Sequence, residues 1–196
     1  MDADRKRWNE RYAGEGYLMG ERPAPFLEEQ LERLLALCPG RLALDIACGE
    51  GRNSVFLARH GFRVTALDIS ENALAKGARL AAAAGVAVDF CQADLEGYTI
   101  DCCYDLILNI NFLLRDLLPS LVAALTPGGI LLVDTLLAVP GTFSPHRPEH
   151  LLQPGELALL FAPYAGTILL AEEQPAVGVP TARLLFQSAG GPAVPA

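Results

Sequence analysis

The sequence predicts an α/β fold built on a mostly parallel sheet with helices on both faces. Short apolar runs, too brief for helices, alternate along the chain with segments of helical period. Turn residues separate the two kinds of segment, and this alternation is typical of parallel sheets covered on both sides. With 196 residues, of which 52% are hydrophobic and 19% charged, the chain is long enough for one domain with a sizeable core.

Five strands are predicted in the first part of the chain, each bounded by turn residues. They cover residues 42–47, 63–67, 86–91, 104–109 and 129–135. Helices are predicted between them, over residues 51–60, 70–84 and 114–125. Gly61 and Gly85 stand directly after the first two helices, where glycine commonly ends a helix, and Pro127 cannot continue the third.

The two ends of the chain depart from this alternation. We expect a helix over residues 154–161 and then two strands, over 166–171 and 181–187, that pair antiparallel. Residues 1–35 are expected to form an N-terminal cap that can lie across the open edge of the sheet. A single domain of residues 1–189 would then be followed by a flexible tail of residues 190–196.

Composition and charge argue against several classes of partner. The net charge is −8 and no run of Lys and Arg is present, which disfavours nucleic acid. The longest uncharged stretch, residues 117–133, is interrupted by Pro127, so no membrane segment is predicted. Charged residues near the N-terminus occupy the place of the apolar core of a signal peptide, and we therefore expect a cytoplasmic protein. The five cysteines show no metal-binding spacing, and no metal site is predicted.

A glycine loop and two aspartates mark the expected binding site. Gly49 and Gly51 follow the first predicted strand, where the backbone of an open parallel sheet can approach a ligand closely. Asp45 lies inside that strand, where a carboxylate is costly to bury without a partner. Asp68 ends the second strand, where an acidic side chain can accept hydrogen bonds from both ribose hydroxyls. These residues together favour a ribose-containing cofactor.

Two cofactor classes share this layout. A dinucleotide site calls for a third glycine, but Ser54 stands in its place, and an additional carboxylate would face the pyrophosphate. S-adenosylmethionine carries an ammonium that Asp45 can meet and a sulfonium group. The charge argument favours S-adenosylmethionine, with an NAD(P)-dependent oxidoreductase as the alternative.

Four motifs in order resemble those of class I S-adenosylmethionine-dependent methyltransferases. They are residues 44–51, 68–70, 93–95 and 125–129. The resemblance implies a Rossmann-like, doubly wound, seven-stranded sheet, mostly parallel with an antiparallel last strand. Within this class, residues 8–12, 49–53 and 148–157 are similar to small bacterial tellurite-resistance-like methyltransferases.

The resemblance also implies which residues bind the cofactor. Asp94 would meet the adenine amino group, although an Asp before Leu95 can also simply cap a turn. Trp8 and Arg11 would belong to a lid, with packing of an amphipathic N-terminal helix as the alternative. The implied set is Asp45, Ala47, Cys48, Gly49, Gly51, Asn53, Asp68, Ile69, Ser70, Ala93, Asp94, Leu95, Asn109, Trp8 and Arg11.

No catalytic residue stands out, but two groups are candidates. Asn109 and Asn111 follow the fourth strand, where they can orient a substrate or act only as turn residues. His146, Arg147 and His150 lie in residues 138–153, a segment expected to form a substrate loop above the cofactor site, with a solvated loop as the alternative. The two histidines lack an evident third ligand, which argues against zinc.

The function predicted is methyl transfer from S-adenosylmethionine to a small-molecule acceptor, without nucleic acid or membrane partners. A protein that binds the cofactor but transfers nothing is a further alternative. The acceptor atom stays open, and either a monomer or a homodimer is compatible with the sequence.

Overall fold

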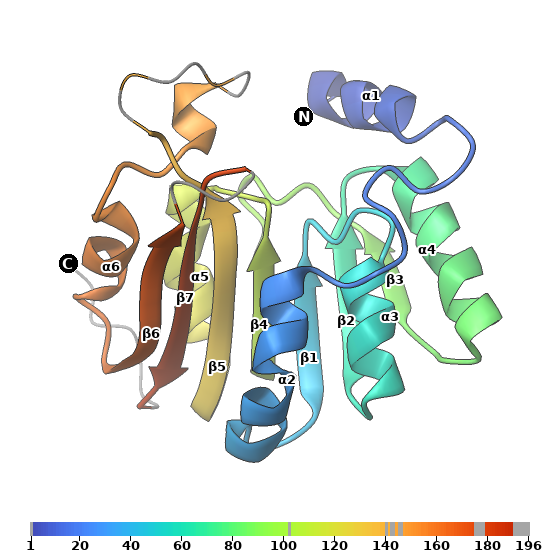
Figure 1. Cartoon of the computed structure of the whole chain (residues 1–196). Helices are drawn as coiled ribbons and strands as arrows, with labels where there is room; N and C mark the ends of the chain where they lie inside the picture. Colours follow the sequence, from blue (N-terminus) through green and yellow to red (C-terminus); the bar gives the residue numbers. More distant parts are fainter. Residues whose placement is uncertain are drawn as a thin grey trace.

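A computed structural model describes residues 2–101, 103–139, 141, 144, 147–174 and 179–189. Its centre is one seven-stranded sheet with strand order β3-β2-β1-β4-β5-β7-β6 (Figure 1). The strands are β1 (Leu42–Ile46), β2 (Arg63–Asp68), β3 (Asp89–Gln92), β4 (Tyr104–Ile110), β5 (Leu125–Leu136), β6 (Gly166–Gln174) and β7 (Thr181–Ser188). The helices are α1 (Asp2–Arg11), α2 (Pro25–Leu37), α3 (Arg52–Arg59), α4 (Glu71–Ala84), α5 (Leu118–Ala123) and α6 (Glu156–Phe161). Two 3₁₀ turns are η1 (Arg115–Leu117) and η2 (Pro148–His150).

The strand directions confirm the predicted fold class. Strands β1 to β5 pair in parallel, whereas β7 pairs antiparallel with both β5 and β6. The two final strands therefore form the antiparallel pair expected from the sequence. The sheet reverses its order at β1, where β2 lies on one side and β4 on the other, and ligands bind at such a switch point in open α/β sheets.

Apolar layers cover both faces of the sheet. Along β4, Leu106 and Leu108 belong to the layer that contains α2 and α3, whereas Ile107 belongs to the layer of α5 and α6. This alternation follows from the two-residue period of a strand. Helix α4 packs beside α3 through Leu80, which contacts Val55.

Two predicted element boundaries are wrong near the middle of the chain. β5 begins at Leu125 instead of residue 129, because the predicted turn lies inside the strand as an irregularity: Leu125 pairs with Tyr104 and Ile130 with Leu106. The helix expected over residues 114–125 is instead a 3₁₀ turn followed by the short α5. Pro119 lies in the first turn of α5, the position in a helix that tolerates a residue without an N–H group.

The N-terminal segment does not lie along the open edge of the sheet as expected. The apolar residues of α2, including Phe26 and Leu34, are fully buried against the face formed by β4, β5 and β7. An edge strand does not offer an apolar surface of this kind, which explains the difference. Helix α1 lies instead beyond the carboxyl ends of the strands, beside α4 (Figure 1).

None of the helices among the described residues is long and apolar enough to cross a membrane. The expected tail, residues 190–196, lies outside the described residues, as does His146 in the expected substrate loop.

Candidate active site

The loop after β1 curls because three of its residues adopt left-handed backbone conformations. Ala47, Gly49 and Gly51 have φ values of 49°, 55° and 75°. A Cβ at Gly51 would lie 2.8 Å from the ring of Phe90, and one at Gly49 would lie 2.9 Å from the Tyr12 hydroxyl oxygen. Glycine is therefore required at both positions by conformation and by close neighbours.

Asp68 joins the end of β2 to this loop. Its Oδ2 accepts the backbone N–H of Gly49 at 2.7 Å, and its Oδ1 accepts that of Ser70 at 2.9 Å. Burial raises the pKa of Asp68, although the two N–H groups oppose this shift. The structure therefore brings together the glycine loop and the carboxylate that the sequence predicts to hold a ribose.

Asp45 is fully buried beneath the loop and is bonded to Ser54. The Ser54 hydroxyl donates to Asp45 Oδ2 at 2.5 Å. Burial raises the pKa of Asp45 from its ordinary value of 3.8 to about 7, against the effect of the Ser54 hydrogen bond, and the charge of Asp68 adds to the rise. Ser54, which replaces the third glycine of a dinucleotide loop, is thus the partner of the buried acid.

The third motif lies next to Asp68. The backbone N–H of Ala93 donates to the Asp68 carbonyl oxygen at 3.0 Å. Asp94 Oδ1 accepts the backbone N–H of Glu96 at 3.1 Å, as in a turn-capping aspartate. The flanking Ala93 and Leu95 are buried. Asp94 therefore lies near the expected adenosine position, with one oxygen already used in a local turn.

An aromatic pair from the N-terminal segment covers the glycine loop. Tyr12 is buried, and its ring stacks on that of Trp8 with centroids 5.7 Å apart. Burial raises the pKa of Tyr12, and the charge of Asp68 raises it further. The Arg11 guanidinium lies 5.2 Å from the Trp8 ring centroid. Tyr12 is thus the residue that contacts the loop, whereas Trp8 is connected to it through its stacking on Tyr12, and the cofactor roles of Trp8 and Arg11 stay predictions.

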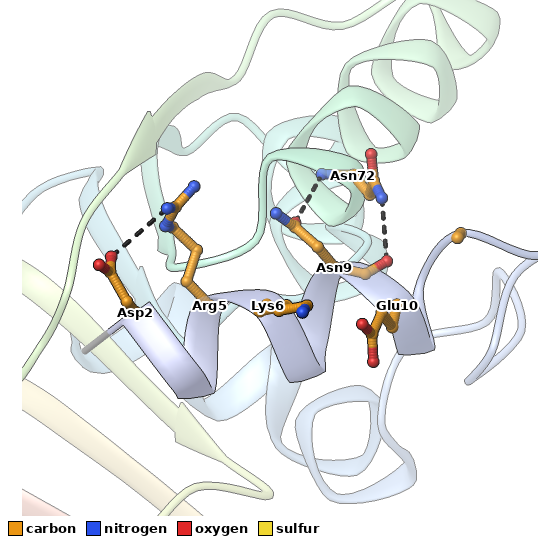
Figure 2. Close-up of a pocket in the computed structure, with 7 residues that line it drawn as sticks. Asp2, Arg5, Lys6, Asn9, Glu10 and Asn72 are labelled. Atoms are coloured by element: carbon orange, nitrogen blue, oxygen red, sulfur yellow. Dashed lines mark hydrogen bonds and ion pairs between the residues drawn. The ribbon is translucent and has the colours of Figure 1, made fainter.

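Helix α1 is fixed to the start of α4 by two asparagines. Asn9 Oδ1 accepts the Ser70 hydroxyl at 2.7 Å, and Asn72 Nδ2 donates to the Asn9 carbonyl oxygen at 2.9 Å. Asn9 and Asn72 line a hollow of about 410 Å³ together with Arg5 and Lys6. Figure 2 shows the side chains of these four residues. Since Ser70 also caps α4, the N-terminal helix is held within two residues of Asp68.

Glu50 and Asn53, in and just after the glycine loop, hold residues 16–24. Glu50 is buried, and its Oε2 accepts the backbone N–H of Leu18 at 2.6 Å, while Oε1 forms a 2.9 Å ion pair with Lys76. Asn53 Oδ1 accepts the backbone N–H of Ala24 at 2.8 Å. The Asn53 side chain, expected to bind the cofactor, has its oxygen bonded to the N-terminal segment. The sequence analysis did not foresee this role.

Asn109 lies within β4 and Asn111 directly follows it, and the two asparagines have different environments. Asn109 is 1% exposed, and its Oδ1 has no hydrogen-bond partner among the described residues. Asn111 is exposed with φ of 57°, a conformation that Asn tolerates, and its N–H donates to the Asp134 carbonyl oxygen at 2.8 Å. Asn109 therefore has the free acceptor, whereas Asn111 forms the turn.

The expected substrate loop is anchored by Arg115, which was not among the candidate residues singled out from the sequence. Arg115 donates to Glu156 Oε1 at 2.6 Å and Oε2 at 3.0 Å, and to the Leu151 carbonyl oxygen at 2.9 Å. Arg147 and His150 are exposed. No pattern near Arg115 could have revealed these contacts, since Glu156 lies 41 residues further along the chain.

Residues 43–129 match the protein family described as a methyltransferase domain. The chain is 29% identical over 162 residues to the ubiquinone biosynthesis O-methyltransferase of Bordetella avium (strain 197N), covering 68% of this chain and 65% of that protein. It spans 45% and 40% of the length of curated relatives from Geobacillus sp. (strain WCH70) and Rickettsia felis. The chain thus covers less than two thirds of these relatives.

Solved structures share this fold. TehB from Haemophilus influenzae has a TM-score of 0.68 at 20% identity, covering 82% of this chain and 62% of that one. A SAM-dependent methyltransferase from Thiobacillus denitrificans, solved in complex with S-adenosyl-L-homocysteine, is 28% identical with a TM-score of 0.52, covering 61% and 52%. The fold predicted from the sequence is confirmed, and the methyltransferase-domain match over residues 43–129 agrees with the predicted class of S-adenosylmethionine-dependent methyltransferases.

Proposed function

We propose that this chain transfers a methyl group from S-adenosylmethionine to a small-molecule acceptor. The observation that carries the proposal is the carboxylate of Asp68 bonded to the N–H of Gly49 at the carboxyl ends of β1 and β2. This hydrogen bond connects the Asp68 carboxylate, which would bind the ribose, to the glycine loop, which would pass beneath the ribose. The methyltransferase-domain match over the same residues supports the proposal.

The residues present fit S-adenosylmethionine. Each Asp68 oxygen accepts one backbone N–H and keeps a lone pair for a ribose hydroxyl. Asn109 has a buried oxygen that finds no hydrogen-bond partner in the described part of the chain, which is costly unless a ligand donates to it. The ring of Tyr12, which contacts Gly49, would attract a sulfonium, since aromatic rings attract cations, whereas the Trp8 ring already has the Arg7 and Arg11 guanidiniums 5.6 and 5.2 Å from its centroid. We therefore assign Asp68, Asn109 and Tyr12 to the cofactor.

Orientation is the main catalytic task in this proposal. S-adenosylmethionine supplies an activated methyl group, and holding the acceptor in line with it can contribute about 7–11 kcal/mol. Asn109 and Asn111 carry amides, which do not take up a proton at neutral pH, so their role would be to position the reactants. Tyr12 and the segment held by Glu50 would exclude water from the cofactor.

The buried acids argue against a nicotinamide enzyme. Ser54 fills the position of the third glycine and donates to Asp45, so a pyrophosphate would approach a loop backed by Asp45 and Asp68. A negative charge on Asp68 would repel a doubly anionic ligand and attract a cationic one, and Asp45, whose pKa is raised to about 7, would add to this effect only when ionised. A protein that binds the cofactor but transfers no methyl group could have the same site. Only a methyl-transfer assay distinguishes it from the proposed enzyme.

The test is an assay with methyl-labelled S-adenosylmethionine and a panel of hydroxylated, thiol and amine metabolites. We expect S-adenosylhomocysteine and one labelled product to form in equal amounts. A protein that binds S-adenosylhomocysteine but labels nothing across the panel would support the non-catalytic alternative. Tighter binding of NAD than of S-adenosylhomocysteine would overturn the proposal.

A further inference from the structure

A cavity of about 480 Å³ opens at the carboxyl ends of β4 and β5. Two residues that line it connect it to the glycine loop: Arg52 directly follows Gly51, and Asn111 directly follows β4. The charges of Asp45 and Asp134 both act on the Arg52 guanidinium. A molecule in this cavity would therefore lie beside a cofactor held by the loop.

Asp134 and Arg183 line this cavity with incompletely bonded polar atoms. Their side chains are 9% and 12% exposed. Asp134 Oδ1 and Arg183 Nε lie 3.6 Å apart, too far for a hydrogen bond, and neither atom has a hydrogen-bond partner within the described part of the chain. A buried polar atom without a partner costs about 1–3 kcal/mol. The pair thus offers one acceptor and one donor to a bound group.

The arginines that line the cavity already face acidic or carbonyl groups. Arg183 Nη1 lies 3.5 Å from Glu29 and 3.5 Å from Glu172, in addition to its contact with Asp134. Arg52 donates to the Met19 carbonyl oxygen at 3.0 Å. The positive charges of Arg52 and Arg183 are thus balanced by Glu29 and Asp134 in the cavity lining, which leaves no excess positive charge for an anionic acceptor such as a carboxylate or a metalloid oxyanion.

A hydroxyl group of a bound molecule could form hydrogen bonds with both of these atoms. It would accept one from Arg183 Nε and donate one to Asp134 Oδ1. Pro25, Ile110 and Val179 also line the cavity and would contact a hydrocarbon body. We infer that this cavity binds the methyl acceptor, and that the acceptor is an uncharged small molecule bearing a hydroxyl group. The inference rests on the proposed function and names the substrate class for it.

Binding of two probes to the chain saturated with S-adenosylhomocysteine tests the inference. Catechol is the uncharged hydroxylated probe, and benzoate is an anionic ring of similar size. We expect catechol to bind at least about tenfold more tightly than benzoate in a calorimetric titration, since a site built for a hydroxyl rejects groups that leave its polar atoms unpaired.

Asp134→Asn should weaken catechol binding at least about tenfold, because the charged acceptor is lost. Glu172→Gln is the matched control: it removes a carboxylate 3.5 Å from the same arginine without altering a residue that lines the cavity. This variant should bind catechol within about twofold of the unchanged chain. Both variants should keep their affinity for S-adenosylhomocysteine.

The outcomes distinguish a failure of the proposed function from a failure of the inferred acceptor site. Failure of S-adenosylhomocysteine to bind would overturn the proposed function and this inference with it. Normal S-adenosylhomocysteine binding with benzoate bound as tightly as catechol would overturn the inference alone, as would unchanged catechol binding in Asp134→Asn. If Asp134→Asn fails to fold, the ratio of catechol to benzoate affinity in the wild-type chain decides whether the inference holds.

Discussion

The Asp68 carboxylate accepts the backbone N–H of Gly49 at 2.7 Å, and this bond ties the ends of two neighbouring strands into one site. The two residues are 19 positions apart in the chain. They meet because β1 and β2 pair in parallel, with Ile46 opposite Leu67, so that the glycine loop begins where Asp68 ends its strand.

Substitution of Gly51 by Ala should destabilise the fold more than the same change at Gly61. Both glycines have positive φ, 75° and 87°, so both substitutions carry the left-handed penalty of about 1–2 kcal/mol. Only Gly51 also faces a neighbour, the Phe90 ring 2.8 Å from the added Cβ, whereas nothing lies within 4 Å at Gly61. Urea unfolding of both variants measures the difference, and equal losses would contradict the close packing.

Asp45→Asn should change how stability depends on pH. The pKa of Asp45 is raised to about 7 in the fold, so the folded state holds a proton that the unfolded chain releases near pH 4. The stability contributed by this proton is complete below about pH 4 and is lost as the pH rises to about 7.

The unfolding free energy of the unchanged chain should therefore fall relative to that of Asp45→Asn between about pH 4 and 7, by a few kcal/mol at most. Denaturant titrations at several pH values measure this difference. Asp68 and Asp134 titrate in both proteins, so their raised pKa values largely cancel. A difference that is constant with pH would show that Asp45 is charged in the fold.

Lys76→Met should loosen the N-terminal segment. Lys76 pairs with Glu50, whose side chain is only 3% exposed, and donates to the Gly16 carbonyl oxygen at 2.6 Å. Removing one partner of a buried pair leaves the other charge uncompensated and costs about 3 kcal/mol. Arg79→Met, on the exposed side of α4, is the control and should cost less than about 0.5 kcal/mol. Faster protease cleavage within residues 13–23 in Lys76→Met alone is expected; equal cleavage rates would argue against this anchor.

Arg115→Ala should destabilise the segment between η2 and α6. Arg115 holds Glu156 through two hydrogen bonds and lowers the pKa of that carboxyl. Loss of these charge-assisted bonds should cost about 2 kcal/mol. Among the contacts within the described residues, Arg147→Ala removes an exposed 3.8 Å pair with Glu149, and it should change the unfolding free energy by less than about 0.5 kcal/mol. If the two variants unfolded alike, Arg115 would not be the anchor.

The sheet could be predicted because each strand carries its own signal. A strand buried on both faces, such as Leu42–Ile46, is a short apolar run bounded by turns, and the order of runs and helices implies parallel pairing. The start of β5 could not be predicted, because the irregularity at residues 126–129 depends on its pairing with Tyr104 and Leu106. Turn residues alone do not distinguish a loop from a bulge.

The candidate site likewise contains some residues that could be predicted from the sequence and others that could not. Asp45, Asp68 and the two glycines could be predicted, since they lie in, at the end of or just after strands whose positions follow from the alternation. The contacts of Glu50 with Leu18 and of Asn53 with Ala24 span 32 and 29 residues and depend on the path of the N-terminal segment. Asp134 and Arg183 meet only because β5 and β7 pair antiparallel, in a register that the local sequence does not encode.

Calorimetric titration of the folded chain with S-adenosylhomocysteine, repeated for Asp68→Ala, tests the central claim most directly. We predict one binding site with micromolar or tighter affinity in the unchanged chain, and a loss of at least about tenfold in the variant, because both ribose hydroxyls lose their acceptor. Absence of binding to the unchanged chain, or equal affinity in Asp68→Ala, would contradict the account.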